Sequence, residues 1–225
     1  MTKTLFFLVF SFLFFTVSGV EASSIPQWVT EKCRKAVIAA NPVKVNYNYG
    51  ELSVDYSKSV EEVSNECGGN AAGCFHGTGG VSTYHGGSDG ISIGKYYCSY
   101  FTAEFNFNYR GSFIDLTRDY NGCNARAVLR HELQHFMIWK TAKEQMHREL
   151  KNTLTDFVVK NIKVCEGHCN NDKKGDIYKV ARQIEKKWRD INEVNDKRLD
   201  DIDHSHKQQV NYNVCSPYSL KFSSY

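Results

Sequence analysis

The chain has 225 residues, and its 28 lysines and arginines are nearly balanced by 25 aspartates and glutamates, which leaves a net charge of +3. Because the basic residues are interleaved with acidic ones, no nucleic-acid-binding face is expected. A chain of this length can bury a core of its own and suits a single domain.

The first residues have the layout of a secretory signal peptide. A lysine near the start is followed by an apolar run over residues 5–17 and by small residues before Ser23. The run is too short for a comfortable membrane span, and an uncleaved N-terminal anchor is the alternative. We therefore expect residues 1–22 to be a signal peptide and residues 23–225 to form one secreted or periplasmic domain, without stable membrane insertion.

Eight cysteines follow the expected signal peptide. An even number in an exported chain predicts up to four disulfide bonds and no free thiol, although the pairing cannot be read from the sequence. The alternative is a metal site at Cys165-Glu-Gly-His-Cys169, but this spacing matches no strong zinc pattern. The eight are Cys33, Cys67, Cys74, Cys98, Cys123, Cys165, Cys169 and Cys215.

Short elements are expected in the first quarter of the mature chain. Residues 27–40 favour a helix that an Asn-Pro pair ends, and residues 43–56 alternate in the manner of a strand. Ser57 or Ser59 can cap a second helix, because two glutamates follow in its first turn.

Glycine pairs crowd residues 67–90. Because glycine interrupts regular structure, this segment predicts a long surface loop. His76 and His85 lie within it and are expected to be exposed.

Residues 91–116 are rich in aromatic side chains and predict β-structure. Phe105 and Phe107 alternate with asparagines, which is typical of a half-buried strand. The aromatic side chains are expected to form the core of a sheet, and a substrate platform is the alternative.

The second half of the chain predicts two helices. One runs from Asn124 to about Lys163, and apolar residues at three- and four-residue spacing over 177–194 indicate a second, amphipathic helix. Strands first and helices second, without alternation, predict an α+β fold with antiparallel aromatic-rich strands.

The first of these helices carries His131-Glu132-Leu133-Gln134-His135. Two histidines four residues apart project from one helical face and can bind one metal ion. The adjacent Glu132 is placed to act as a general base on an attacking water, while a zinc ion would acidify that water and polarise a carbonyl group. The spacing therefore predicts zinc-dependent hydrolysis, above all of peptides.

The context supports a metal site, although only three positions of the pattern are fixed and a chance match occurs on the order of once in a hundred chains. The motif lies on a convincing helix in an exported chain. Its apolar neighbours predict that this helix is buried, where two histidines and a glutamate without a partner would be costly. These neighbours are Val128, Leu129, Leu133, Phe136 and Met137.

A catalytic zinc needs a third protein ligand, which the local sequence does not supply. The metzincin continuation is missing after His135. His147 would lie about 18 Å farther along the same helix, too far to share the ion. The remaining candidates are His168, His204, His206 and carboxylates such as Glu166.

In its layout the chain resembles a bacterial family of predicted secreted zinc-dependent proteases. In that family a tyrosine-rich strand and a short helix precede a strand region that leads into HExxH, and a long helical part ends in Tyr-Asp-x-x-Thr-x-His-Gly. The HExxH residues fit, and residues 202–205 occupy the place of the late pattern, although most of its positions differ. The resemblance implies His204 as the third ligand. The helical periodicity alone leaves His206 and a solvated helix end as alternatives.

Taken together, these patterns predict a zincin-like domain that binds Zn²⁺ through His131, His135 and His204, with Glu132 as the base. It would be a secreted metallopeptidase acting on a peptide or protein. The resemblance alone implies that the strand near Phe105 is the edge along which the peptide pairs. The alternative is a disulfide-stapled binding or structural protein whose HExxH motif is accidental or holds an inert metal.

Overall fold

The structure is a computed structural model. It describes residues 25–68, 71–77, 81–120, 122–171 and 174–205, with the side chains of 81, 174 and 202–205 excepted.

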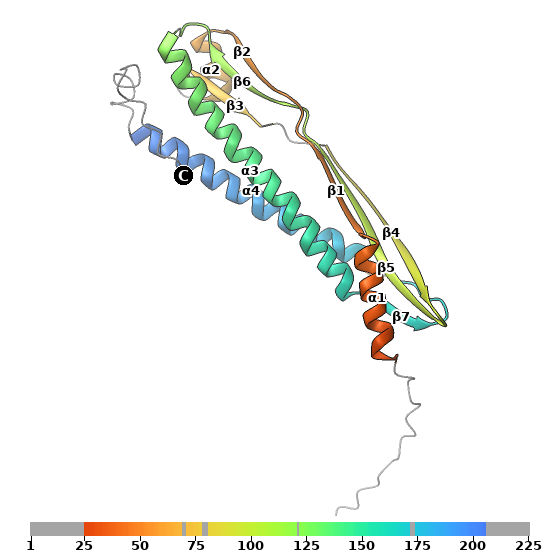
Figure 1. The fold of residues 1–225 in the computed structure, drawn as a ribbon. Coiled ribbons are helices and arrows are strands. Elements are labelled where there is room, and N and C mark those ends of the chain that lie inside the picture. Colours follow the sequence, from red (N-terminus) through yellow and green to blue (C-terminus); the bar gives the residue numbers. More distant parts are fainter. Residues whose placement is uncertain (1–24, 69–70, 78–80, 121, 172–173, 206–225) are drawn as a thin grey trace, which may run out of the picture.

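Two long helices lie side by side and give the molecule an elongated shape (Figure 1). α3 (Gly122–Lys160) packs against strands on one flank and against α4 (Lys174–Ser205) on the other. α1 (Gln27–Ala39) lies at the end of the molecule where α3 ends. The predicted α+β fold is confirmed.

The strands of the described segments form two mixed sheets. In the first, β5 is central, with β4 antiparallel on one edge, and with β1 parallel and β7 antiparallel on the other. In the second, β6 is central between parallel β2 and antiparallel β3. The expectation of antiparallel strands therefore holds for only some of the pairs. The strands are β1 (Val43–Asn48), β2 (Leu52–Lys58), β3 (Gly73–His76), β4 (Val81–Ile93), β5 (Tyr96–Asn108), β6 (Ser112–Thr117) and β7 (Lys163–Glu166).

Two stretches of chain cross together from the first sheet to the second. β1 leads into β2, and beside it β5 leads into β6. The paired residues up to Asp55 lie sixty positions apart, as Val43 and Ala103 do, and the register shifts before Lys58, which pairs with Thr117. At the crossing, Gly50 and Gly111 have φ of 66° and 83°. A Cβ on Gly50 would lie 2.6 Å from the backbone nitrogen of Gly111, so the close approach requires glycine.

The predicted first and second helices are confirmed. α2 (Val60–Cys67) begins at Ser59, whose hydroxyl accepts a hydrogen bond from the backbone of Glu62 while the Glu62 carboxylate accepts one from the backbone of Ser59. This reciprocal arrangement satisfies backbone N–H groups that the helix itself leaves without partners.

The prediction of a loop over residues 67–90 is wrong, because β3 and most of β4 lie within it. The glycines do not interrupt the strand here, and they allow neighbouring side chains to pack against its backbone. A Cβ on Gly90 would lie 2.0 Å from the Tyr97 ring, so glycine at that position leaves room for an aromatic side chain of β5. His85 is exposed as expected, whereas His76 is half-buried.

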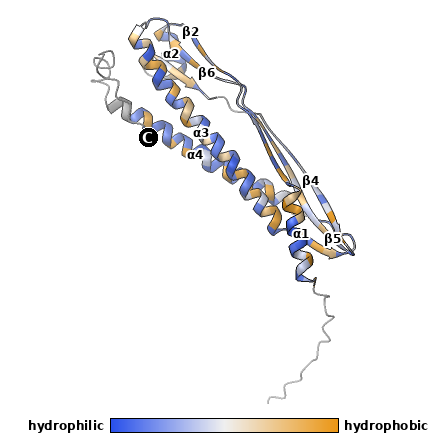
Figure 2. Cartoon of the chain, viewed as in Figure 1, coloured by the Kyte–Doolittle hydropathy of each residue, from blue (hydrophilic) through white to orange (hydrophobic). Residues whose placement is uncertain are grey.

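The aromatic strand forms the core, as predicted. Phe101, Phe105 and Phe107 of β5 are 1%, 0% and 4% exposed and pack with the inner faces of α3 and α4. Both helices alternate between hydrophilic and hydrophobic residues in Figure 2, as helices with one buried face do. Because β5 has strands on both edges, the expectation that the strand near Phe105 offers an edge to a peptide is wrong.

Three disulfide bonds link described cysteines, and Cys123 is disulfide-bonded as well. No cysteine within the described ranges is free, which fits an oxidising, extracellular environment. The three bonds are Cys33–Cys98, Cys67–Cys74 and Cys165–Cys169. None of the helices in this part of the chain is both long and apolar enough to cross a membrane.

Candidate metal centre

The HExxH motif lies in the first third of α3, on the predicted helix. The Glu132 and His135 residues are buried, whereas the His131 side chain is 25% exposed. The prediction that apolar neighbours bury the helix holds only in part, because Val128, Leu129 and Phe136 are half-buried. Leu133 and Met137 are 36% and 57% exposed. The motif therefore lies at the margin of the core, within reach of water.

Two aspartates of α4 face the two histidines of α3. The nearest oxygen of Asp200 lies 3.3 Å from Nε2 of His135 and 3.8 Å from Nε2 of His131. The Nε2 atoms of the two histidines are 3.0 Å apart. One ligand atom from each of these three residues thus converges on a common point, which makes them a group that could hold a metal ion.

The size of this triangle fits zinc. With zinc–ligand bonds of about 2.0–2.1 Å and tetrahedral angles, two ligand atoms lie about 3.3 Å apart. The three separations of 3.0, 3.3 and 3.8 Å lie around that value. Two imidazoles and a carboxylate are also ligands that zinc accepts.

Asp196 orients His135. Its carboxylate lies 2.6 Å from Nδ1 of His135, so Nδ1 carries the proton and Nε2 presents its lone pair to the centre of the triangle. Burial lowers the pKa of His135, but the hydrogen bond to Asp196 and the nearby carboxylates outweigh burial and leave the pKa above its ordinary value.

Glu132 lies on the side of α3 that faces β3. Its carboxylate accepts a hydrogen bond from the backbone of Phe75, and the charges of His135, Asp196 and Asp200 act on it. Burial, reinforced by the two aspartates, raises the pKa of Glu132 to about 7, against the opposing effects of His135 and the Phe75 hydrogen bond. A carboxyl group with this pKa can both accept and release a proton near neutral pH.

The structure separates from this centre both His147, which its distance along the helix already excluded, and the candidates His168 and Glu166. His147 is 2% exposed in an aromatic cluster, where its Nε2 lies 2.9 Å from the Tyr109 hydroxyl. The His168 ring packs against Tyr97, and Glu166 pairs with Lys95. The side chain of His204 and the whole of His206 lie outside the described residues.

Asp196 and Asp200 were missed by the sequence reasoning, yet a signal was present. They continue the inward-facing positions of α4 in steps of four residues from Ile184 through Trp188 and Asn192. Acidic residues that replace apolar ones on the buried stripe of an amphipathic helix indicate a polar partner on the neighbouring helix.

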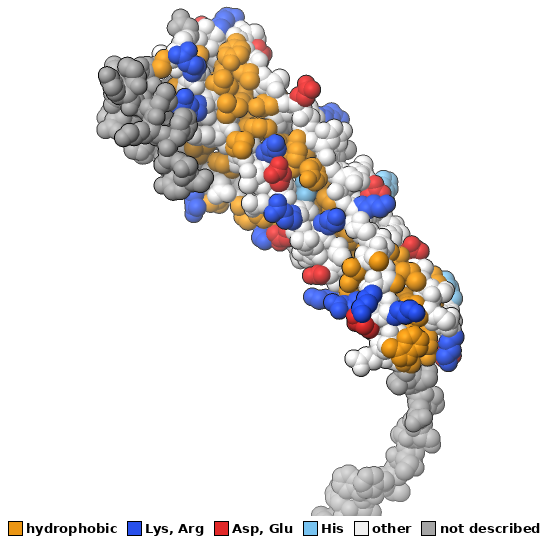
Figure 3. Space-filling model, in the orientation of Figure 1, with side chains coloured by type: hydrophobic (Ala, Val, Ile, Leu, Met, Phe, Trp, Pro, Cys, Tyr) orange, Lys and Arg blue, Asp and Glu red, His pale blue; other side chains and the backbone are white. Residues whose placement is uncertain are grey.

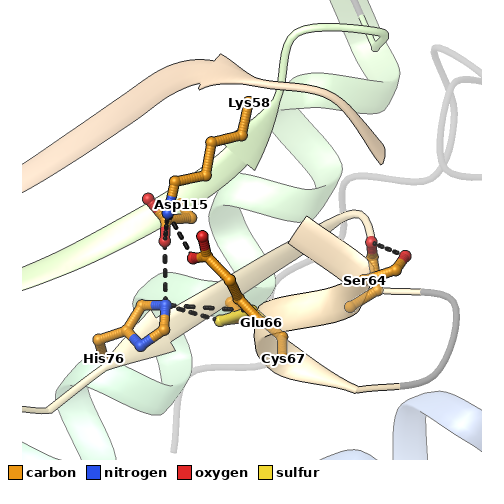
Figure 4. The surroundings of a disulfide bond; sticks show 8 residues. Lys58, Ser64, Glu66, Cys67, His76 and Asp115 are labelled. Carbon is orange, nitrogen blue, oxygen red and sulfur yellow. Dashed lines mark hydrogen bonds and ion pairs between the residues drawn. A yellow bond between two sulfur atoms is a disulfide. The ribbon is translucent and has the colours of Figure 1, made fainter. Parts of the chain in front are cut away.

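Two further groups of possible metal ligands share His76 and lie on the face of the second sheet opposite α3 (Figure 4). In one, the sulfurs of Cys67 and Cys74 are joined in a disulfide and are not free to bind a metal. In the other, the Lys58 ammonium already pairs with the carboxylates of Glu66 and Asp115 and offsets one of their two charges. Neither group is as suitable a metal site as the helix pair.

The helix-pair site is an open one. Cavities of about 420 Å³ and 380 Å³ lie elsewhere, the first lined by residues such as Lys44 and His85 and the second by Tyr84 and Arg182. On the face that Figure 3 shows, basic and acidic side chains are mixed, without a continuous basic region.

No known protein family, curated protein or solved structure matches the chain, so the resemblance to a protease family remains an expectation.

Proposed function

We propose that the chain is a secreted zinc-dependent metallopeptidase in which His131, His135 and Asp200 hold the metal and Glu132 is the general base. The observation that carries the proposal is the convergence of three ligand atoms at separations of 3.0–3.8 Å, with Asp196 fixing the tautomer of His135. This arrangement meets both the ligand geometry and the orientation that zinc sites require.

Each residue has a distinct part in the proposed reaction. Bound zinc would supply a Lewis acid that polarises the scissile carbonyl and a water that is nucleophilic at neutral pH. Glu132 accepts the proton of the attacking water on its carboxylate and later delivers a proton to the leaving amine. Burial keeps the pKa of the Glu132 carboxyl group above that of a carboxyl group in bulk water. Asp196 holds His135 in place during both steps.

The surroundings of the site favour a peptide over a small molecule. The Asp200 side chain is 45% exposed, so the site opens to the surface rather than into an enclosed cavity. Within the described residues β3 pairs only with β6, and the backbone of Phe75 points away from β6 toward Glu132. An unpaired strand edge beside the base can pair with an extended peptide.

A structural metal is the second candidate, because the ligands come from two helices that pack against each other. A metal held between α3 and α4 would clamp the helix pair whether or not it also catalyses a reaction. Zinc content and peptide cleavage, measured on the same variants, separate the two functions.

The experiment compares four variants, with folding checked by circular dichroism. Glu132→Gln should retain zinc and lose cleavage of casein by roughly 10²–10⁴-fold, because the base is gone and the ligands remain. Asp200→Asn should lose zinc, and Asp196→Asn should bind it about 10–100-fold more weakly. The control is Asp201→Asn, an exposed neighbour of Asp200, which should match the parent in both assays.

Three results would contradict the proposal in different parts. Parent protein that takes up no zinc removes the metal centre. If the parent binds zinc but cleaves no peptide, so that it does not differ from Glu132→Gln, only the structural role of the metal remains. A fifth variant, His204→Ala, tests the family resemblance: zinc loss in it together with full zinc in Asp200→Asn would make His204 the third ligand.

A further inference from the structure

The disulfide between Cys67 and Cys74 lies among polar groups on the face of the second sheet opposite α3 (Figure 4). It joins the end of α2 to β3, and both cysteines are half-buried. Nε2 of His76 lies 2.9 Å from the sulfur of Cys74 and 4.0 Å from that of Cys67. The imidazole therefore contacts the two sulfurs unequally.

The imidazole can donate a hydrogen bond at this position. A carboxylate oxygen of Asp115, a pure acceptor, lies 3.0 Å from the same Nε2 and favours the tautomer with the proton on Nε2, where this proton is shared between Asp115 and the Cys74 sulfur. Lys58 lies 2.8 Å from Asp115 and also pairs with Glu66, so its ammonium offsets one of the two carboxylate charges. A thiolate on Cys74 would thus face an N–H donor, and such a donor lowers the pKa of a thiol.

The other two described disulfides lack such a donor. Cys33 and Cys98 are both 0% exposed, so an external thiol cannot reach them in the folded protein. Cys165 and Cys169 are half-buried, as Cys67 and Cys74 are, but carbonyl oxygens lie 3.4–3.9 Å from their sulfurs. Acceptor oxygens repel a developing thiolate, so neither sulfur is a good leaving group.

We propose that Cys67–Cys74 is a thiol-exchange site, opened by a low-molecular-weight thiol that attacks Cys67. The attacking thiolate forms a new disulfide with the sulfur of Cys67, the Cys67–Cys74 bond breaks, and its electron pair leaves on Cys74. His76 holds the resulting thiolate. A second molecule of the small thiol then attacks the small-thiol sulfur of the mixed disulfide. This step releases the disulfide of the small thiol and leaves Cys67 and Cys74 reduced.

The direction of attack follows from the two distances. The rate of exchange rises as the pKa of the leaving thiol falls. Because His76 lies closer to Cys74 than to Cys67, Cys74 is the better leaving group and Cys67 receives the external thiol.

The first test uses the full-length parent protein with a limiting amount of reduced glutathione. The reaction is quenched with N-ethylmaleimide, and peptide mass spectrometry locates both adducts. We expect glutathione on Cys67 and maleimide on Cys74, formed at least about tenfold faster than any adduct at Cys165 or Cys169. Preferential opening of Cys165–Cys169, or glutathione equally or mainly on Cys74, would overturn the proposal.

A pair of histidine variants tests the cause. His76→Phe keeps a ring but removes the N–H donor, and should slow opening by about tenfold and abolish the preference for Cys67. His168→Phe is the matched control, because His168 neighbours Cys169 but packs on Tyr97, and it should change neither rate nor position. A folded His76→Phe protein that opens as fast as the parent would contradict the role of His76. If this variant does not fold, the adduct positions in the parent decide the question.

Discussion

His135 and His147 lie about three turns apart on one helix and occupy opposite environments. His135 is held by Asp196 at 2.6 Å, and the carboxylates around it favour its protonated form despite burial. His147 lies among tyrosines, and the ring of Tyr47 stacks on its imidazole. No carboxylate offsets the lowering of its pKa by burial. His135 is therefore oriented by a carboxylate and must release a proton when it binds a metal, whereas His147 is a neutral residue of the core.

The pH dependence of stability should report on His147. Burial, reinforced by Lys143, lowers the pKa of His147 to about 4. Between pH 6.5 and 4 the unfolded chain binds a proton that the folded chain refuses, so stability is lost as the pH falls through this window. We expect the parent to lose about 2 kcal/mol more than His147→Phe between pH 7 and pH 4.5, measured by urea unfolding with a chelator present.

The control for this prediction is His85→Gln, because His85 is exposed on β4. Its unfolding free energy should follow that of the parent across the same pH range. Equal pH dependence in the parent and in His147→Phe would show that folding does not lower the pKa of His147.

About half of the candidate site could be predicted from the sequence. The spacing of His131 and His135 defines one helical face, so the pair and the adjacent glutamate follow from local geometry. Asp196 and Asp200 could not be assigned in the same way, because their role depends on how α4 lines up with α3. Helix periodicity determines which face is buried, but not which turn of the neighbouring helix it meets.

At the scale of secondary-structure elements, the crossing of the two strand pairs is the most constrained feature. Gly50 and Gly111 lie against each other with left-handed backbone conformations, and each connects two strands of different sheets. The sheets are therefore joined by two neighbouring segments rather than by one hinge.

Substitution at this crossing should destabilise the fold. Gly50→Ala adds left-handed strain of about 1–2 kcal/mol and a contact with the backbone of Gly111 that neither strand can relieve locally. We expect a loss of about 3 kcal/mol in the free energy of unfolding. Gly94→Ala is the matched control, since its φ is +63° but nothing lies within 4 Å of the added Cβ. A loss no greater than that of Gly94→Ala would show that the two segments separate easily.

The sequence predicted helices better than strands for a physical reason. The cap at Ser59 and the apolar spacing of α4 are local signals, and both helices were located correctly. The parallel pairing of β1 with β5 depends on contacts across sixty residues, which no local pattern encodes. The glycines of β4 were misread, because the room they leave for Tyr97 is evident only when β5 lies beside them.

At the scale of the whole molecule, the core runs along the second half of α3, from Trp139 to Val158. A helix of 39 residues is about 58 Å long, so the molecule is narrow for its length. Cys33–Cys98 and Cys165–Cys169 secure the end where α1 and β7 lie, and Cys67–Cys74 secures the second sheet. Disulfides therefore reinforce both ends of an elongated fold.

Thiol titration of the mature, denatured, non-reduced protein should find no free group, because all eight cysteines are expected to be paired. The three described bonds leave Cys123 and Cys215, and Cys215 lies outside the described residues. A non-reduced digest should accordingly contain a peptide in which these two are linked. Two or more free thiols would contradict the prediction.

The offset of sixty residues, which β1–β5 shares with the β2–β6 pairs up to Asp55, constrains how this chain can change through insertions and deletions. Extra residues between β2 and β5 can be accommodated in turns, because they do not alter which residues pair. An extra residue within the first crossing segment would shift Gly50 away from Gly111 and turn every following side chain to the other face. In descendants of the same ancestor, a length change in one crossing segment should therefore be accompanied by an equal change in the other.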